Sequence, residues 1–243
     1  DRCRQYALRK KSARGKFTAM CDVVNKLPQE VLARHLRVRF AGRRDVARVE
    51  EFYKQHQATN QVARDLGAII RASELQRLYV IEETRDNQIV AAGACCAHCD
   101  GRYVELGGAV VRWKGYGLQR VLTHIRTVQS LVMTSADVQV FCIVEPGATG
   151  LRERMRVLGF DPWQEPPQEL IEELAGEGHS GGDYMIFAAD RVEEHRLGLL
   201  ELSRRRSVTH IGDGTAASLS LDVLLNTDAH FKKALESAAP IPT

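Results

Sequence analysis

Apolar and polar positions along the chain repeat with two different periods. Residues 36–41 alternate, which predicts a strand because successive strand side chains point to opposite faces. Apolar residues in RRDVARVEEFYKQHQ (43–57) recur every three or four positions, which predicts a helix, and VARDLGAIIRASELQ (62–76) predicts a second one. Residues 78–111 then contain three apolar, β-branched runs separated by RDNQ and CDGR, so we expect three consecutive antiparallel strands.

The middle of the chain changes period repeatedly. YGLQRVLTHIRTVQSLVM (116–133) carries one apolar face and predicts a long amphipathic helix. DVQVFCIVE (137–145) is mostly apolar, as in a strand buried on both sides, and TGLRERMRVLGF (149–160) predicts a short helix closed by Gly159. DYMIFAAD (183–190) predicts a late strand. This order indicates a mixed α/β fold with a central, mostly antiparallel sheet flanked by helices.

Both ends of the chain differ from this middle part. Residues 1–36 predict a basic helical lead-in, and 191–243 a C-terminal extension of helix, strand and helix, which could form a lid, a dimer arm or a separate unit. The first 44 residues hold thirteen Lys and Arg against three acids, a net charge of +10, whereas the whole chain carries +3 and its remainder therefore −7. A basic segment of this kind can bind RNA phosphates, or it can simply be solvated.

Composition excludes some classes of protein. With 243 residues, 44% of them hydrophobic, the chain can bury a substantial core. It has no run near the roughly 20 apolar residues that a membrane span needs, and no secretory signal, so we expect a cytoplasmic location without a membrane span. Because the chain begins with Asp1, we expect it to be a piece of a longer protein. Its oligomeric state is not predicted.

Six cysteines raise the question of a metal site. Three of them lie in ACCAHCDG around His98, but alternate residues of a strand face opposite ways and no second ligand pair follows at zinc-site spacing. We therefore expect unpaired, partly buried thiols and no metal. The full set is Cys3, Cys21, Cys95, Cys96, Cys99 and Cys142.

AVVRWKGYGLQRVL (109–122) joins the third strand of the meander to the long helix through Gly115 and Gly117. The first N–H groups of a helix lack internal acceptors and favour an anion, and Arg112 and Lys114 add positive charge, so we expect a phosphate site. A plain tight turn is the alternative. The string GxxxxGK[ST] is absent, and Arg120 stands where a dinucleotide fingerprint needs its third glycine.

Arg112-Trp-Lys-Gly115-Tyr-Gly117 resembles the [QR]-x-x-G-x-[GA] motif of the GCN5-related N-acetyltransferase (GNAT) superfamily. The likeness in element order covers roughly 37–190. It implies acetyl-CoA or another acyl-CoA as cosubstrate, with its pantetheine arm along the motif strand, its pyrophosphate on the loop, and Gly107-Gly108 where two parallel strands diverge. The cofactor-binding residues implied are Val110, Val111, Arg112, Trp113, Lys114, Gly115, Tyr116, Gly117 and Leu118.

Acyl transfer to an amine needs a neutral amine, and a lysine-like amine is mostly protonated at pH 7. Glu105 is the general base that the resemblance implies; an outward-facing surface carboxylate is the alternative. The family often places a Tyr acid where this chain has Met155, and an Asn near Ala148, so a water could replace the acid. Tyr184 is a distant candidate.

WQEPPQELIEELAGEGHSGGDY (163–184) lies where the family builds its acceptor cleft. Its carboxylates could attract a cationic amine, or they could form a solvated helix and loop. His179 could also face the cleft. The acidic residues are Glu165, Glu169, Glu172, Glu173, Glu177 and Asp183.

The sequence therefore predicts an N-acyltransferase that moves an acyl group from acyl-CoA to a primary amine by direct attack in a ternary complex. Two alternatives remain open. A catalytically degenerate domain would bind acyl-CoA or a protein partner, and a tRNA-directed acetyltransferase would use the basic lead-in to bind RNA.

Overall fold

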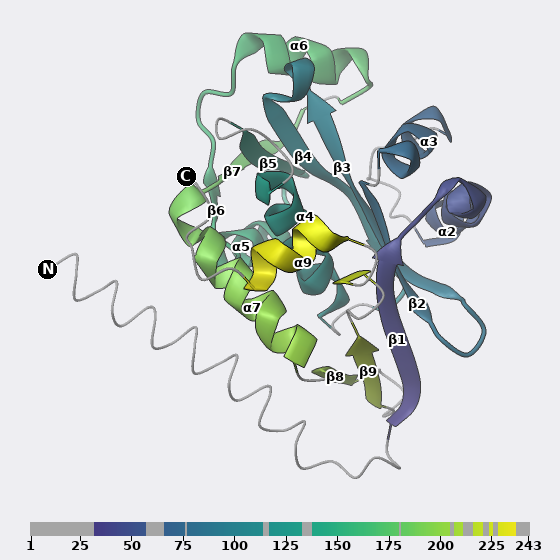
Figure 1. The fold of residues 1–243 in the computed structure, drawn as a ribbon. Coiled ribbons are helices and arrows are strands. Elements are labelled where there is room, and N and C mark those ends of the chain that lie inside the picture. Colours follow the sequence, from purple (N-terminus) through teal and green to yellow (C-terminus); the bar gives the residue numbers. More distant parts are fainter. Residues whose placement is uncertain are drawn as a thin grey trace, which may run out of the picture.

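The computed structural model describes residues 32–56, 66–75, 77–113, 117–132, 138–179, 181–204, 207–210, 216–220, 224–225 and 228–236. The basic lead-in up to residue 31 and the loop residues Lys114, Gly115 and Tyr116 lie outside these ranges. The helix predicted over 1–36 is wrong for its described part, since residues 32–36 belong to a strand. The described strands form one nine-stranded sheet in the order β6-β7-β5-β4-β3-β2-β1-β9-β8 (Figure 1). Only the β1–β9 and β4–β5 pairs in it are parallel, so the predicted mixed α/β fold with a mostly antiparallel sheet is confirmed.

The predicted meander forms the centre of the sheet. β2 (Leu78–Glu83), β3 (Ile89–His98) and β4 (Tyr103–Val111) are antiparallel neighbours, and β1 (Leu32–Phe40) pairs with β2. Asn87 and Asp100, in the two predicted turns, both adopt φ of 57°, which Asn and Asp tolerate better than most residues. The turn residues thus fix which strands are neighbours.

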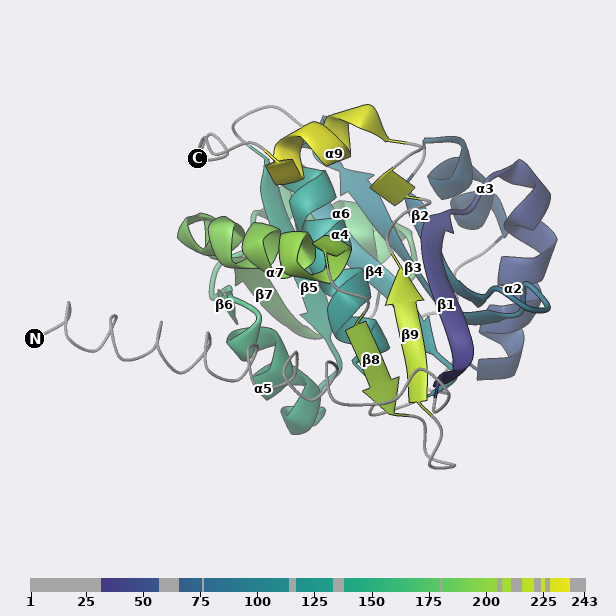
Figure 2. The same cartoon turned by 60° about the horizontal axis from the view of Figure 1, so that its bottom comes forward.

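Helices cover both faces of the sheet. α2 (Val46–His56) and α3 (Leu66–Glu74) lie on one face. On the other, α4 (Leu118–Val132) packs under α7 (Val192–Arg204) and α9 (Ala229–Glu236), as Figure 2 shows. Every residue from 121 to 130 is buried, because α4 contacts the sheet on one side and these two helices on the other.

The elements after α4 complete one edge of the sheet. β5 (Gln139–Val144), α5 (Thr149–Val157) and β7 (Asp183–Phe187) match the predicted strand, helix and strand, and Gly159 ends α5 with φ of 92°. The sequence did not predict β6 (Phe160–Pro162), which is only three residues long. α6 (Gln168–Gly176) packs its apolar face over Phe141.

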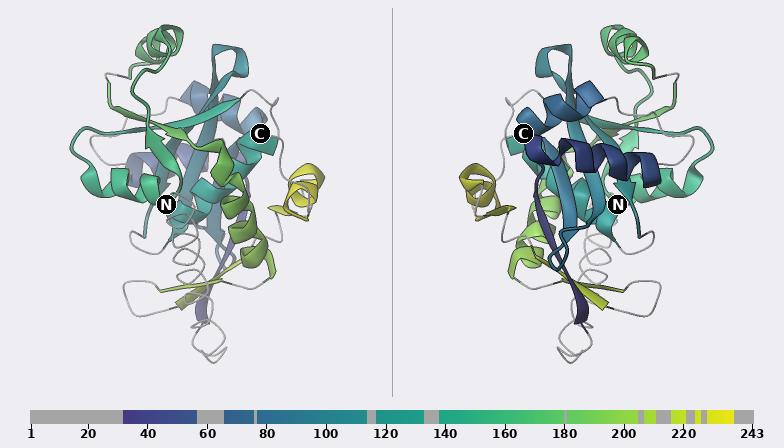
Figure 3. Two further views of the ribbon diagram at one scale, coloured as in Figure 1. Left: turned by 90° about the vertical axis from the view of Figure 1, so that its left-hand side faces the viewer. Right: turned by 90° about the vertical axis from the view of Figure 1, so that its right-hand side faces the viewer.

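The C-terminal extension belongs to the same sheet. β9 (Ala216–Ser220) lies parallel to β1, and β8 (Ser207–His210) pairs with β9 (Figures 2 and 3). His35 Nδ1 and Ser218 Oγ are 2.7 Å apart across the β1–β9 pair. Of the roles that the sequence left open, the described part of 191–243 is therefore an integral edge and layer of the fold rather than a separate unit.

Among the helices that the structure describes, none combines the length and the apolar character that crossing a membrane requires.

We expect Phe231→Ala, in α9, to lower the free energy of unfolding by about 3–5 kcal/mol. The ring is fully buried in the core where α9 packs against α4 and α7. Lys232→Ala at the exposed neighbouring position should change it by less than about 0.5 kcal/mol. Urea unfolding of both variants measures the difference. Equal stability of the two would show that α9 is not part of the cooperative core.

Candidate functional site

β4 and β5 diverge in the middle of the sheet. They pair only where Tyr103, Val104 and Glu105 face residues 139–141. Beyond that point the register of β4 against β3 slips between Ala92 and Ala94, and Gly108 adopts φ of 59°, so β4 carries a bulge and turns away from β5. The structure thus places the divergence at Gly107-Gly108, and along 107–111 the β5-facing edge of β4 has no partner strand among the described residues.

A cleft of about 130 Å³ opens at this divergence. β4 and β5 form its walls. α4 contributes Gln119, Thr123 and Arg126, and His179 and Met155 lie at its margin. The sequence indicates His179, Met155 and the β4 residues as parts of the site. It gives no signal for the side chains from α4.

Arg126 is the largest charged group in the cleft wall and is only 2% exposed. Its Nη1 donates to the carbonyl oxygens of Gly107 (2.9 Å) and Ala94 (3.1 Å), and its Nε donates to Leu122 (3.2 Å). No carboxylate of a described residue lies within 4 Å of the guanidinium. Gly93 allows this approach, since a Cβ there would lie 3.2 Å from Arg126 Cζ. The guanidinium therefore donates to backbone carbonyls of both β3 and β4 beside the bulge.

The predicted phosphate loop is described only at its ends. Arg112 is exposed, Trp113 is half-buried, and Gly117 has φ of 76° with open space where a Cβ would be. Leu118 is the first residue of α4, so the unsatisfied N–H groups of this helix begin at the loop, as the sequence predicts. Val110 and Val111 pair with β3 on their other edge.

Glu105 is buried, with 3% of its surface exposed, so the alternative of an outward-facing carboxylate is wrong. Its neighbours Val104 and Leu106 pack in the core beneath α4. Because strand side chains alternate, Glu105 points to the opposite face, into the wall of the cleft. Glu105 Oε2 lies 3.5 Å from Nε2 of His98.

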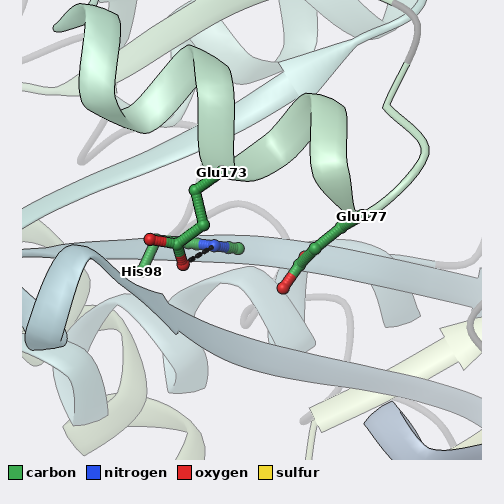
Figure 4. A group of neighbouring side chains, drawn as sticks. All are labelled: His98, Glu173 and Glu177. Atoms are coloured by element: carbon green, nitrogen blue, oxygen red, sulfur yellow. Dashed lines mark hydrogen bonds and ion pairs between the residues drawn. The ribbon is translucent and has the colours of Figure 1, made fainter.

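α6 is tied to the end of β3 by its own carboxylates (Figure 4). Glu173 Oε1 lies 3.1 Å from His98 Nδ1, and Glu173 Oε2 accepts the N–H of Cys99 at 2.9 Å. Arg102 donates to Glu169 at 2.8 Å. Partial burial opposes the shift, but the bonds from Cys99 and His98 lower the pKa of Glu173. Part of the acidic segment is thus engaged inside the protein.

One more carboxylate of the acidic segment 163–184 is also paired within the protein. Asp183 forms an ion pair with Arg152 at the start of α5. All five glutamates of the segment, those that bond to the end of β3 included, are exposed; they are Glu165, Glu169, Glu172, Glu173 and Glu177.

The cysteines near the cleft are thiols of the core. Cys95 and Cys142 are buried and unpaired, and burial raises the pKa of both. The group of metal-binding types that the described residues bring together contains no cysteine: atoms of His98, Glu173 and Glu177 lie within 4.8 Å of one another. Within this group, His98 Nδ1 and Glu173 Oε1 are 3.1 Å apart.

No proton donor occupies the position at which the resemblance implies a tyrosine. Met155 is buried there and lines the cleft, and Ala148 precedes α5. Tyr184 on β7 is half-buried beside Phe141, and burial raises its pKa.

No protein-family model matches the sequence, and no curated protein matches it. Among solved structures, a Mycobacterium tuberculosis protein in complex with CoA is 16% identical over 62% of this chain and 98% of that chain, with a TM-score of 0.47. The loading GNATL domain of CurA from Lyngbya majuscula is 13% identical (63% and 96% covered, TM-score 0.47). A GNAT-family acetyltransferase from Staphylococcus aureus is 12% identical (63% and 98%, TM-score 0.48).

We expect Arg126→Met to lower the free energy of unfolding by about 2–5 kcal/mol, because the carbonyls of Ala94 and Gly107 would lose their donor while still buried. Arg120→Met, exposed on the same helix, is the matched control. Denaturant titration gives both values. A stability equal to that of the control would mean that the bulge does not depend on the guanidinium.

Proposed function

We propose that the chain is a member of the GNAT superfamily and transfers an acetyl or other acyl group from acyl-CoA to a primary amine. The observation that carries the proposal is the divergence of β4 from β5 directly before a glycine-containing loop at the N-terminus of α4. The divergence leaves a strand edge open beside a cleft, and the helix start offers N–H donors to an anion. An extended ligand with a phosphate group fits both.

In this proposal the ligand is held by backbone groups. The open edge of β4 at Val110 and Val111 bonds the pantetheine arm as an added strand would. Amides of the loop from Trp113 to Leu118, with the charge of Arg112, hold the pyrophosphate. Gly117 suits this role because its positive φ and lack of a side chain let a phosphate approach.

The chemistry is direct attack of an amine on the thioester, with both substrates bound at once. Glu105 lies in the cleft wall and accepts the proton of the amine, directly or through one water. The amine nitrogen forms a bond to the carbonyl carbon, and the CoA thiolate leaves. Because Met155 donates no proton, water protonates the thiolate. The amine enters from the side of α6, and the exposed carboxylates of Glu165 and Glu177, which flank the two ends of this helix, favour a cationic acceptor.

Met155 also favours a second candidate function. A domain without the tyrosine acid could bind acyl-CoA without turning it over and serve as a regulatory or assembly module. The tRNA-directed variant depends on the basic lead-in, which lies outside the described residues.

We expect acetyl-CoA to bind the chain, and Gly115→Glu to weaken binding at least tenfold, because a carboxylate in the loop repels the pyrophosphate. Gly176→Glu makes the same change at an exposed, open position on α6 and should leave the affinity unchanged. Isothermal titration calorimetry distinguishes them. Equal affinities for the two variants would refute the loop assignment.

We expect Glu105→Gln to lower kcat about 100-fold or more while acetyl-CoA affinity stays within twofold, because only the proton acceptor is lost. Glu172→Gln, exposed on α6, serves as control. CoA release is followed with polyamines, lysine peptides and aminoglycosides as acceptors. If acetyl-CoA binds tightly but no amine is acylated by the parent chain, the binding module is the correct function.

A further inference from the structure

His98 lies at the end of β3 between two carboxylates that come from different parts of the chain. Its ring is 1% exposed, with Nε2 3.5 Å from Glu105 of β4 and Nδ1 3.1 Å from Glu173 of α6. Figure 4 shows the contact with Glu173 and places Glu177 on the same side of the ring. The third neighbour, Phe141 of β5, offers only its ring, with centroids 5.9 Å apart.

Two carboxylates on opposite ring nitrogens favour the imidazolium form. A neutral imidazole has one N–H donor, so one nitrogen would present a lone pair to a carboxylate, whereas the imidazolium donates on both sides. Burial alone would disfavour the charge, but Glu105, Glu177 and Glu173 outweigh it and raise the pKa of His98. Among the described residues, these three carboxylates, from β4, α6 and the end of α6, are the charged groups with the largest effect on the ring.

We propose that His98 is a positioning residue that keeps Glu105 ionised and oriented in the cleft, and that it does so only while α6 is docked through Glu173. This inference rests on the proposed function. It assigns His98, at the end of β3, a role that neither the loop motif nor the residues lining the cleft indicate. His98 links α6, beside the entrance for the amine, to Glu105, the proton acceptor.

α6 is suited to such a link because polar contacts hold it against the end of β3. Glu173 bridges the His98 ring and the N–H of Cys99, and Glu169 pairs with Arg102, the residue directly after the η3 turn (Cys99–Gly101). Undocking would remove Glu173 and Glu177, two of the three carboxylates that stabilise the imidazolium. A neutral His98 would in turn stop favouring the ionised form of Glu105.

The pH range of docking follows from the direction of each shift. His98, with its raised pKa, stabilises docking fully below about pH 6.5, its ordinary value, and this contribution is lost as pH rises through its folded-state pKa. Glu173, with its lowered pKa, contributes above its ordinary value, and this is lost as pH falls through its folded-state pKa. Docking is therefore strongest between the ordinary pKa values of Glu173 and His98, and it weakens on both sides of that range.

The test uses the full chain with His98→Gln, which keeps an amide donor but no charge, and Glu173→Gln, whose site is exposed and tolerant. Glu172→Gln, one position along α6, is the matched control. In both test variants we expect the acid limb of the kcat/KM profile to move up by about one pH unit, because Glu105 loses the neighbouring cation. The protection factor of the α6 amides, in which the intrinsic pH dependence of exchange cancels, should fall with rising pH in the parent chain and lose this dependence in His98→Gln.

Exchange in α6 needs no turnover, and acetyl-CoA calorimetry reports separately on the proposed function, so the two failures are distinguishable. If Glu173→Gln leaves both the acid limb and α6 exchange as in Glu172→Gln, the link is wrong. Stoichiometric binding of Zn²⁺ or Mn²⁺, lost in both His98→Gln and Glu177→Gln, would make the cluster a metal site and also overturn the proposal.

Discussion

The contact between the Arg126 guanidinium and the carbonyls of Gly107 and Ala94 is the interaction on which the cleft depends. A bulge in the centre of a sheet leaves carbonyl groups without ladder partners, and burying such groups costs free energy. Here the guanidinium from α4 donates to two carbonyls beside the bulge. Once they are satisfied, β4 can leave β5 and still belong to the sheet. An opening that would otherwise weaken the middle of the fold becomes a stable feature of it.

The two faces of the sheet contribute different chemistry to that opening. From the α4 side come Arg126 and the polar residues of the first helical turns; from the opposite side comes Glu105, backed by His98. The cleft therefore has a cation fixed by backbone oxygen on one wall and a carboxylate fixed by a histidine on the other. Each charge is oriented from outside the cleft: Arg126 by carbonyls of β3 and β4, and Glu105 by a histidine that also contacts Glu173 of α6.

Local patterns were enough to predict the elements but not the contacts between them. The helix at 118–132 and the three strands before it follow from periodicity and turn residues, and the loop at Gly117 from glycine spacing. Short strands such as β6 carry too few residues for a pattern. The sequence carries no local signal for the role of Arg126, because the residues whose carbonyls it contacts lie 19 and 32 positions away. His98 was read with the cysteines beside it in sequence, whereas its partners are Glu105 and, 75 positions on, Glu173. Charge pairing over such distances leaves no local signal.

The pairing of β1 with β9 has a consequence for the order in which the protein can be completed. His35 and Ser218, which meet across this pair, are 183 residues apart in the chain. While the chain emerges from the ribosome, β1 can pair with β2 early, but its other edge stays open until β9 has been made. A prematurely stopped product would keep that edge exposed as a template for a strand from another molecule. β9 and β8 thus cover the edge of β1 and keep it from pairing with a strand of another molecule.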